Sequence, residues 1–221
     1  MGRVNDLEGA LRNTALPPGD AGAGAAAGRF IARAEDEGLL EIAYSSVDSP
    51  LGELLAVVTP RGLLRLSYDP TRNDAVLDDI AAKVSPRVLE APARLDPVRR
   101  QLDEYFEGRR RSFDLKLDWS LTRGFFQKVL RETARLGYGE LATYKQMAEA
   151  AGSPRATRAA GNALGSNPIP IVVPCHRIVR TGGKMGGYGG SLGPYIGGPG
   201  IKQRLLELEG ALDEHGHPRI G

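Results

Sequence analysis

Residues 169–179 constrain the fold more than any other part of this chain, because they join an apolar run to the only cysteine. The run 171–173 predicts a short buried strand. Pro174 has no backbone N–H to give to a ladder, so we expect the strand to stop there. Cys175 and His176 come next. Because successive side chains of a strand point to opposite faces, these two can cooperate only across a tight turn or through a bridging water.

A cysteine beside a base can form an activated thiolate. The alternative is that the lone cysteine is a small buried hydrophobic residue. One cysteine cannot form an internal disulfide, which is typical of a reducing cytoplasm. It cannot build a cysteine-rich zinc site either, and the two other histidines, His215 and His217, lie in the terminal tail, so we predict no metal.

Charge is unevenly distributed along the chain, although the formal net charge is only +2. Residues 1–120 hold 16 basic and 20 acidic side chains, whereas residues 121–221 hold 13 and 7. The window between Ala150 and Leu206 has no acidic residue and carries Arg155, Arg158, Arg177, Arg180, Lys184, Lys202 and Arg204. An acid-free basic face suits a polyanion such as DNA, and a solvated basic surface is the alternative.

No apolar run approaches membrane-spanning length, and the first ten residues are polar and mixed in charge. We therefore predict neither a membrane span nor a signal peptide, and we expect a soluble cytoplasmic protein without membrane partners. Residues 1–42 are expected to be a flexible N-terminal extension, since residues 17–28 are low in complexity. Residues 213–221 are expected to be a tail.

Residues 43–118 predict a small α/β domain. Runs at 42–47, 51–59 and 63–68 are separated by short turns, which favours an antiparallel meander. Asn73 is expected to cap a helix through Val84, and Asp96 to cap a second helix that ends at Gly108. Residues 113–117 are a candidate edge strand.

Residues 119–212 predict a mainly helical domain. Thr122 is expected to cap a first helix, Thr143 begins a capping box with Gln146, and Ser153-Pro154 is expected to start a helix reaching Leu164. The last two helices, with their tight turn, resemble a helix-turn-helix, although many helical hairpins share this pattern. A final helix is predicted over 201–209.

The helix after Ser153 is rich in small residues, among them Thr157, Ala159 and Gly161. Helices that read bases normally carry long polar side chains. A small-residue face would instead bring the backbone close to DNA without reading sequence, and close packing on the protein core is the alternative. Arg158 is the one long side chain at the centre of this helix.

The block Pro174-Cys175-His176-Arg177 follows Asn167-Pro168-Ile169-Pro170 and precedes Gly-Gly-Tyr-Gly-Gly at 186–190. This pattern resembles the O6-alkylguanine-DNA alkyltransferase family, also called methylated-DNA–protein-cysteine methyltransferases, over roughly residues 43–210. The resemblance implies a ribonuclease-H-like α/β domain with an antiparallel sheet, followed by a winged-helix-like helix-turn-helix domain. It implies direct-reversal repair of O6-alkylguanine, with O4-alkylthymine as a further substrate, in one turnover and without a cofactor.

The resemblance also implies roles for individual residues. Glu209 would bond His176, which would draw the proton of Cys175 through a water, although a plain surface glutamate is the alternative. Tyr144 would press on the adjacent phosphate and donate toward N3 of the leaving guanine. Asn167 would brace the turn before the active-site strand.

Duplex DNA containing the lesion is the implied partner, bound through its minor groove by a monomer, with cooperative packing along DNA left open. Arg158 would fill the gap left by the flipped base; the other implied DNA-binding residues are Arg155, Thr157, Ala159, Gly161 and Tyr144. The implied base pocket comprises Tyr188, Gly189, Gly190, Ile178 and Leu164, and a glycine-rich linker is the alternative for its loop. Residues 191–200 form a longer link than is usual in the family, which suggests a movable rim that admits larger alkyl groups.

Two alternatives belong to other functional classes. A non-catalytic lesion-binding protein of the alkyltransferase-like kind would lack the cysteine, so Cys175 argues against it. A thiol hydrolase with a Cys-His-Glu triad would need an oxyanion hole and turnover, and would not need Arg158 on a helix-turn-helix.

Overall fold

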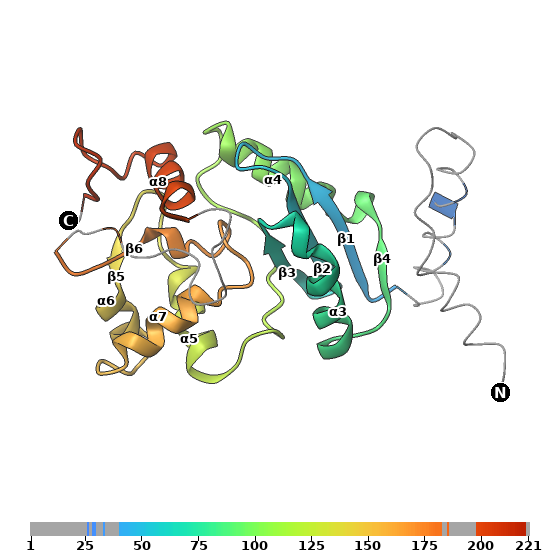
Figure 1. The fold of residues 1–221 in the computed structure, drawn as a ribbon, viewed down its shortest axis with the longest axis horizontal. Helices are drawn as coiled ribbons and strands as arrows, with labels where there is room; N and C mark the ends of the chain where they lie inside the picture. Colours follow the sequence, from blue (N-terminus) through green and yellow to red (C-terminus); the bar gives the residue numbers. More distant parts are fainter. Residues whose placement is uncertain are drawn as a thin grey trace. The chain divides into compact units, whose positions relative to one another are not determined.

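The computed structural model describes residues 40–182, Met185 and residues 198–219, together with Ala26, Gly28, Arg29 and Arg33 (Figure 1). Met1–Leu40 and Glu41–Gly221 form separate units, and the site lies wholly in the second. Most of the predicted extension, the loop around Tyr188, Gly189 and Gly190, and residues 191–197 fall outside the described residues.

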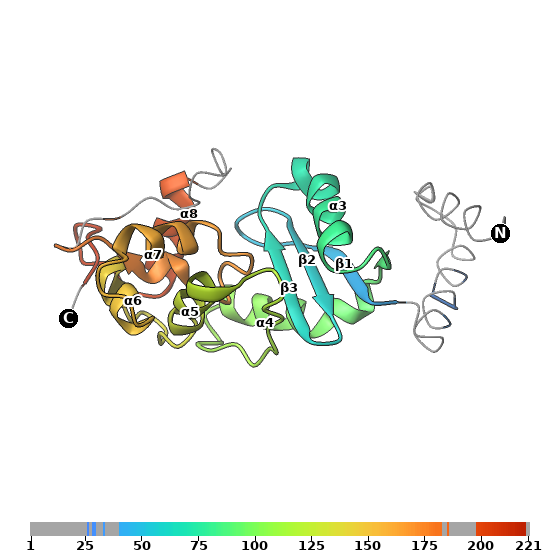
Figure 2. The ribbon, with the colours of Figure 1, turned by 90° about the horizontal axis from the view of Figure 1, so that it is seen from below.

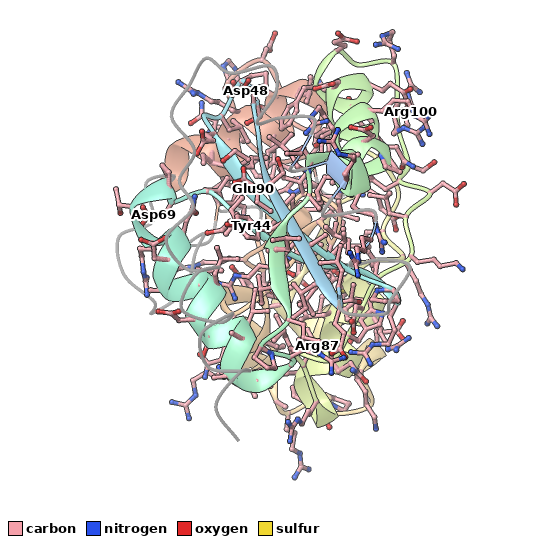
Figure 3. All side chains as sticks on the ribbon, turned by 90° about the vertical axis from the view of Figure 1, so that its right-hand side faces the viewer. Tyr44, Asp48, Asp69, Arg87, Glu90 and Arg100 are labelled. Atoms are coloured by element: carbon pink, nitrogen blue, oxygen red, sulfur yellow. The ribbon has the colours of Figure 1, made fainter. Side chains whose placement is uncertain are left out.

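A four-stranded sheet forms the first half of the second unit, in the order β3-β2-β1-β4. The antiparallel neighbours β1 (Ile42–Val47), β2 (Leu54–Thr59) and β3 (Gly62–Ser67) form the predicted meander. The sequence did not indicate β4 (Val88–Glu90), which pairs in parallel with β1, because three residues are too few to show an alternating pattern. Figure 3 labels Tyr44 and Glu90, which are opposite each other on these two strands.

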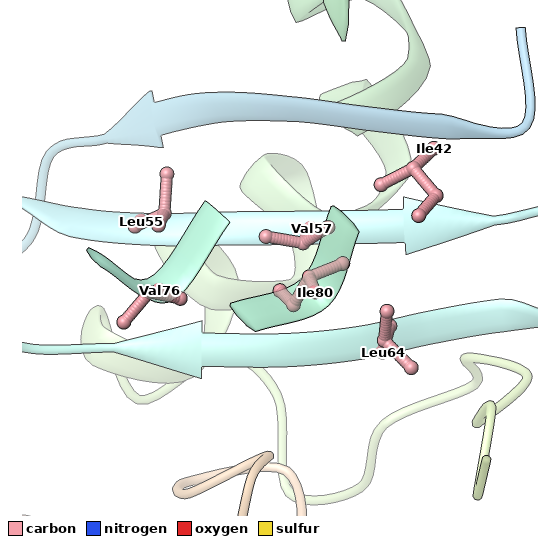
Figure 4. Packing of buried hydrophobic residues seen from close by; sticks show 6 residues of the cluster. All are labelled: Ile42, Leu55, Val57, Leu64, Val76 and Ile80. Carbon is pink, nitrogen blue, oxygen red and sulfur yellow. The ribbon is translucent and has the colours of Figure 1, made fainter. Parts of the chain in front are cut away.

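Helices cover both faces of this sheet (Figure 2). On one face α3 (Asn73–Lys83) closes an apolar cluster over the strands (Figure 4), comprising Ile42, Leu55, Val57, Leu64, Val76 and Ile80. On the other face lies α4 (Asp96–Phe106), whose buried side chains include Leu102 and Tyr105. Burial of such apolar side chains is the main force that holds the layers together.

The predicted caps of these helices were wrong by one to a few residues. Asn73 lies inside α3, and the side chain of Asp69 instead caps the preceding 3-10 turn, η1 (Pro70–Arg72). Asp96 is already helical, because the 3-10 turn η2 (Pro92–Leu95) runs directly into α4.

The predicted edge strand at 113–117 is reduced to an isolated parallel bridge between Leu117 and Leu63. The backbone N–H of Leu63 donates to Lys116 at 2.8 Å, and the N–H of Asp118 donates to Leu63 at 2.9 Å. A Cβ atom on Gly62 would lie 2.2 Å from the Lys116 carbonyl oxygen, so only glycine allows this approach.

The second half is mainly helical, with α5 (Gly124–Thr133), α6 (Tyr144–Ala150), α7 (Thr157–Gly165) and α8 (Gly198–Leu208). Two short parallel strands, β5 (Ala142–Thr143) and β6 (Ile178–Val179), also belong to it. Helices α5, α6 and α7 pack against one another. Within the described residues, none of the helices combines the length and the apolar character that a membrane crossing requires.

Of the four helix starts predicted in this half, one is confirmed, and the final helix, predicted over 201–209, begins three residues earlier as α8. The capping box is present, with the Gln146 N–H donating to the Thr143 hydroxyl at 3.2 Å. Thr122 was wrong as a cap, since its hydroxyl donates to the Trp119 carbonyl and Arg123 precedes α5. The start at Ser153 was also wrong, because residues 153–156 form a separate turn and α7 begins only at Thr157.

The predicted strand at 171–173 is wrong, because this segment is a turn. Pro168, Pro170 and Pro174 lack the N–H groups that a ladder would use. Instead the N–H of Val173 donates to Ile169, and Ile171 adopts a φ of 72° that β-branched residues rarely occupy. The strand at this point of the chain is β6, which follows Cys175 and His176.

Candidate active site

Cys175 begins a single 3-10 turn, η3 (Cys175–Arg177), at the end of the proline-rich turn. The residue is partly exposed. The Asn167 side chain makes three contacts with this turn. Its Nδ2 donates to the Val173 carbonyl at 2.8 Å and lies 3.1 Å from Sγ of Cys175. Its Oδ1 accepts from the Ile169 N–H at 3.0 Å. One amide side chain therefore holds the turn and the sulfur together.

His176 is completely buried, and its Nε2 lies 2.9 Å from Oε1 of Glu209. Because an ionised carboxylate only accepts, the proton of the neutral ring is placed on Nε2. The other nitrogen, Nδ1, is buried and has no hydrogen-bond partner among the described residues. Burial lowers the pKa of His176, and the neighbouring Glu209 opposes this. The imidazole is therefore a neutral base near neutral pH.

Glu209 accepts five hydrogen bonds although its side chain is buried. Oε1 accepts from His176, from the Tyr105 hydroxyl at 2.7 Å and from Nη2 of Arg177 at 2.8 Å. Oε2 accepts from Nε of Arg177 at 2.8 Å and from the Gly139 N–H at 3.1 Å. Burial alone would raise the pKa of Glu209, but the bonds from His176 and Arg177 outweigh it and hold the pKa well below its usual range.

Arg177 corrects the expected basic face, because its side chain is buried against Glu209 instead of lying on the surface. Its Nη1 also donates to the Leu136 carbonyl at 2.6 Å. This ion pair could not be predicted from a local pattern, since Arg177 and Glu209 are separated by more than thirty residues. The planar guanidinium matches a carboxylate with two parallel bonds, which a lysine could not do.

Lys202 is the second correction to that basic face. It is fully buried in α8, and its Nζ donates to the Ile178 carbonyl. Burial lowers the pKa of Lys202 to about 8, while the nearby Cys175 acts in the opposite direction. The spacing was a usable signal, because Leu205 and Leu206, three and four residues later, are both buried and share the face of Lys202.

Tyr144 lies half-buried at the first position of α6. Its ring is adjacent to Gly161 of α7, where an added Cβ would lie 3.7 Å from it. Burial raises the pKa of Tyr144, and Cys175 adds to the effect, so the hydroxyl keeps its proton at neutral pH.

The small residues of α7 were interpreted either as packing on the protein core or as allowing close approach to DNA. The structure is compatible with both, because one face of the helix is buried and the other is not. Ala160, Ala163 and Leu164 are buried against the protein. Arg158 is exposed, as is Arg155 just before the helix, while Thr157, Ala159 and Gly161 are half-buried. Ile178, expected in the base pocket with Leu164, is completely buried in β6.

The site thus places the partly exposed Cys175 directly before a buried imidazole, which is hydrogen-bonded to a buried carboxylate. Within the described ranges, no group of three or more histidine, cysteine or acidic side chains could hold a metal ion. The arrangement suits proton removal from a sulfur nucleophile.

Two family models match most of this chain. Residues 42–119 match the ribonuclease-like domain of 6-O-methylguanine DNA methyltransferase, and residues 124–211 match the DNA binding domain of the same family. The mixed sheet followed by a helical domain agrees with both matches, so the predicted fold class is confirmed. The one amendment is that β4 makes the sheet mixed, not purely antiparallel.

Several relatives are similar to this chain over nearly their whole length. The methylated-DNA–protein-cysteine methyltransferase of Mycobacterium tuberculosis (strain ATCC 25618 / H37Rv) is 36% identical over 173 residues, covering 76% of this chain and 92% of the relative. The constitutive enzyme of Bacillus subtilis (strain 168) is 36% identical over 169 residues, with coverages of 75% and 94%. The crystal structure of the Mycobacterium tuberculosis protein in complex with DNA has a TM-score of 0.58 at 35% identity, covering 76% of this chain and 93% of that one.

Proposed function

This chain belongs to the 6-O-methylguanine DNA methyltransferase family, and on that premise we propose how its residues act on a lesion. The resemblance carried by the Pro-Cys-His-Arg block is confirmed, and so is the expected function, which is repair of DNA alkyl lesions by transfer to a protein cysteine. The lesion, the groove and the residue roles described below belong to the proposal.

The substrate is O6-alkylguanine in duplex DNA, with O4-alkylthymine as a second substrate. The reacting carbon is inaccessible inside the stack, so the nucleotide is flipped into the site. Helix α7 lies in the minor groove, and the exposed Arg158 fills the space that the base leaves. The half-buried small residues Thr157, Ala159 and Gly161 support this, because they let the backbone come close to DNA.

The chemical step is an in-line displacement at the alkyl carbon. Nδ1 of His176 takes the proton of Cys175 through a water, and Glu209 stabilises the imidazolium that results. The thiolate forms a new S–C bond as the C–O bond to guanine breaks. The Tyr144 hydroxyl keeps its proton and donates a hydrogen bond toward N3 of the guanine. This bond stabilises the negative charge that develops on the leaving base. The product is a thioether, so one molecule repairs one lesion without a cofactor.

One observation carries this proposal, namely the partly exposed Cys175 next to the buried and hydrogen-bonded pair of His176 and Glu209. The test is intact-mass spectrometry after mixing the protein with excess duplex containing O6-methylguanine. We expect a mass gain of one methyl group per molecule and a reaction that stops at one equivalent. The matched control is Cys175→Ser, which should bind the duplex but gain no mass, because a hydroxyl is too weak an acid for the same base.

The alternatives give different results in the same experiment. A thiol hydrolase would turn over beyond one equivalent and return to its starting mass. A lesion-binding protein would bind the duplex without any mass gain in the wild type. Methyl transfer by Cys175→Ser at a tenth of the wild-type rate would contradict the assignment of the nucleophile.

A further inference from the structure

A side chain of the ribonuclease-like domain reaches into the relay. Tyr105 comes from α4, and its hydroxyl donates to Oε1 of Glu209 at 2.7 Å across a sequence separation of 104 residues. Oε1 is also the oxygen that faces Nε2 of His176. The family matches place these two ends in different domains, 42–119 and 124–211.

The Tyr105 ring is held tightly, so its hydroxyl has a fixed direction. The side chain is completely buried and packs against Phe106, Phe113 and Tyr138, with ring centroids 5.4, 5.2 and 6.1 Å away. Burial and the adjacent Glu209 raise the pKa of Tyr105, so the hydroxyl remains a donor throughout the pH range in which a thiol ionises.

The other partners of Glu209 do not specify how Oε1 is shared with the imidazole. Arg177 donates to both carboxylate oxygens, and the Gly139 N–H donates only to Oε2. Tyr105 is the third donor to Oε1, and without it this oxygen would be held only by the imidazole and by Nη2 of Arg177. With one donor fewer on Oε1, the carboxylate can shift against the guanidinium and lengthen its contact with Nε2.

We propose that Tyr105 is a positioning residue for alkyl transfer, which holds Oε1 of Glu209 opposite Nε2 of His176. The role rests on the relay of the proposed function and adds to it a contribution from the ribonuclease-like domain. Tyr105 contacts neither substrate nor thiol, and its effect passes entirely through Glu209. The charged and titratable groups around this contact are His176, Arg177, Tyr138, Arg111 and Lys202.

The test uses Tyr105→Phe in the full chain, which keeps the ring packing and leaves four donors on the carboxylate. A freer carboxylate weakens the imidazole as a base, so the thiol pKa rises and less thiolate is present at neutral pH. We expect the single-turnover transfer rate to fall about tenfold near neutral pH, the scale of one hydrogen bond to a charged group. The loss should shrink to about twofold or less at high pH, where the thiol ionises unaided.

The thiol pKa is measured separately, from the pH dependence of iodoacetamide modification; the single cysteine makes this readout specific. The matched control is Tyr138→Phe, whose lost hydroxyl donates to the Leu208 carbonyl at 2.8 Å and not to the carboxylate. We expect this control to leave the thiol pKa unchanged. Glu209→Gln should raise the thiol pKa more than Tyr105→Phe does.

The double variant of Tyr105→Phe and Glu209→Gln decides whether Tyr105 acts through the carboxylate. A rate equal to that of Glu209→Gln alone supports the proposal. Additive losses, or a thiol pKa that Tyr105→Phe leaves unchanged while Glu209→Gln shifts it, would overturn the role of Tyr105 alone. If Glu209→Gln itself leaves the thiol pKa unchanged, the relay of the proposed function is wrong and this inference is overturned with it.

Discussion

At the scale of single residues, the site depends on charges that are buried in compensating pairs. A buried carboxylate is costly unless cations and donors surround it, and Arg177 supplies two of the five bonds to Glu209. The buried Lys202 is different, because its described hydrogen bond is to a neutral carbonyl. We therefore expect the charge of Arg177 to stabilise the fold and the charge of Lys202 to oppose it.

Removing Arg177 leaves Glu209 with an uncompensated charge. Arg177→Met should lower the free energy of unfolding by about 3–5 kcal/mol, the range for breaking a buried ion pair from one side. Urea unfolding measures the change, and the matched control is Arg204→Met on the exposed side of α8, which should change it by less than about 0.5 kcal/mol. Similar small effects of both substitutions would show that the pair contributes little to the fold.

Lys202 should make stability depend on pH in the alkaline range. Its pKa is lowered from 10.5 to about 8 by burial, so between these values the unfolded chain binds a proton that the folded chain does not. Stability therefore rises as pH increases from about 8 toward 10.5, and the rise from this group is lost as pH falls through about 8.

The measurement is the urea midpoint at several pH values between about 8 and 9.5, below the usual tyrosine range. Lys202→Met should lack much of the rise seen in the wild type, whereas Lys145→Met, a substitution at an exposed site on α6, should keep it. A wild-type midpoint that is flat over this range would mean that Lys202 keeps its charge when buried.

At the scale of elements, the proposed function assigns α7 to binding of the duplex and not to the chemical step. Its buried residues pack on the protein, and Arg158 is left exposed on the other side. The residues of the proposed relay lie elsewhere: Cys175 and His176 are on η3, and Glu209 directly follows α8. Repair of duplex DNA and reaction with a free base should therefore respond differently to changes in α7.

Arg158→Ala should slow transfer from duplex O6-methylguanine by about tenfold or more, because a flipped base costs a few kcal/mol that the arginine helps to offset. Transfer from a free O6-substituted guanine should change by less than about twofold, since no base has to be replaced. The ratio of the two single-turnover rates is the measurement. Equal losses on both substrates would place Arg158 in folding or chemistry.

At the scale of the whole unit, two hydrogen bonds between described residues connect the sheet and α4 with the catalytic half. The Leu66 N–H on the edge strand β3 donates to the Pro168 carbonyl at 2.9 Å, beside Asn167. Tyr105 on α4 reaches Glu209 at the end of α8. Because one of these hydrogen bonds ends at Glu209 and the other ends next to Asn167, loosening the sheet should loosen the site as well.

We therefore expect residues 41–219 to unfold in one cooperative transition. Fluorescence of Trp119, the single tryptophan, and far-UV circular dichroism should give the same urea midpoint. Leu102→Ala, a substitution at a buried position of α4, should lower the free energy of unfolding by about 2–5 kcal/mol. The urea midpoints measured by the two signals should therefore fall together. Two separate transitions would show that the halves unfold independently.

The sequence by itself determined the features that depend on neighbours along the chain. The meander follows from three apolar runs with short turns, the capping box from Thr143 and Gln146, and the candidate nucleophile from Cys175 beside His176. Each pattern spans a few residues, so local geometry and propensity suffice to predict it. The family resemblance rests on the same kind of local block.

Only the tertiary structure decided which polar side chains are buried and what they bind. Arg177 and Lys202 were expected on a basic surface, and no sequence pattern singled out Tyr105. In the structure Arg177 and Lys202 are buried, and Arg177 and Tyr105 both donate to Glu209. The segment 171–173 is a turn and not the predicted strand, because the neighbouring prolines cannot donate to a ladder and Asn167 donates to the Val173 carbonyl. Contacts of this kind join residues far apart in sequence, and their energies depend on desolvation and pairing that exist only after the chain has packed.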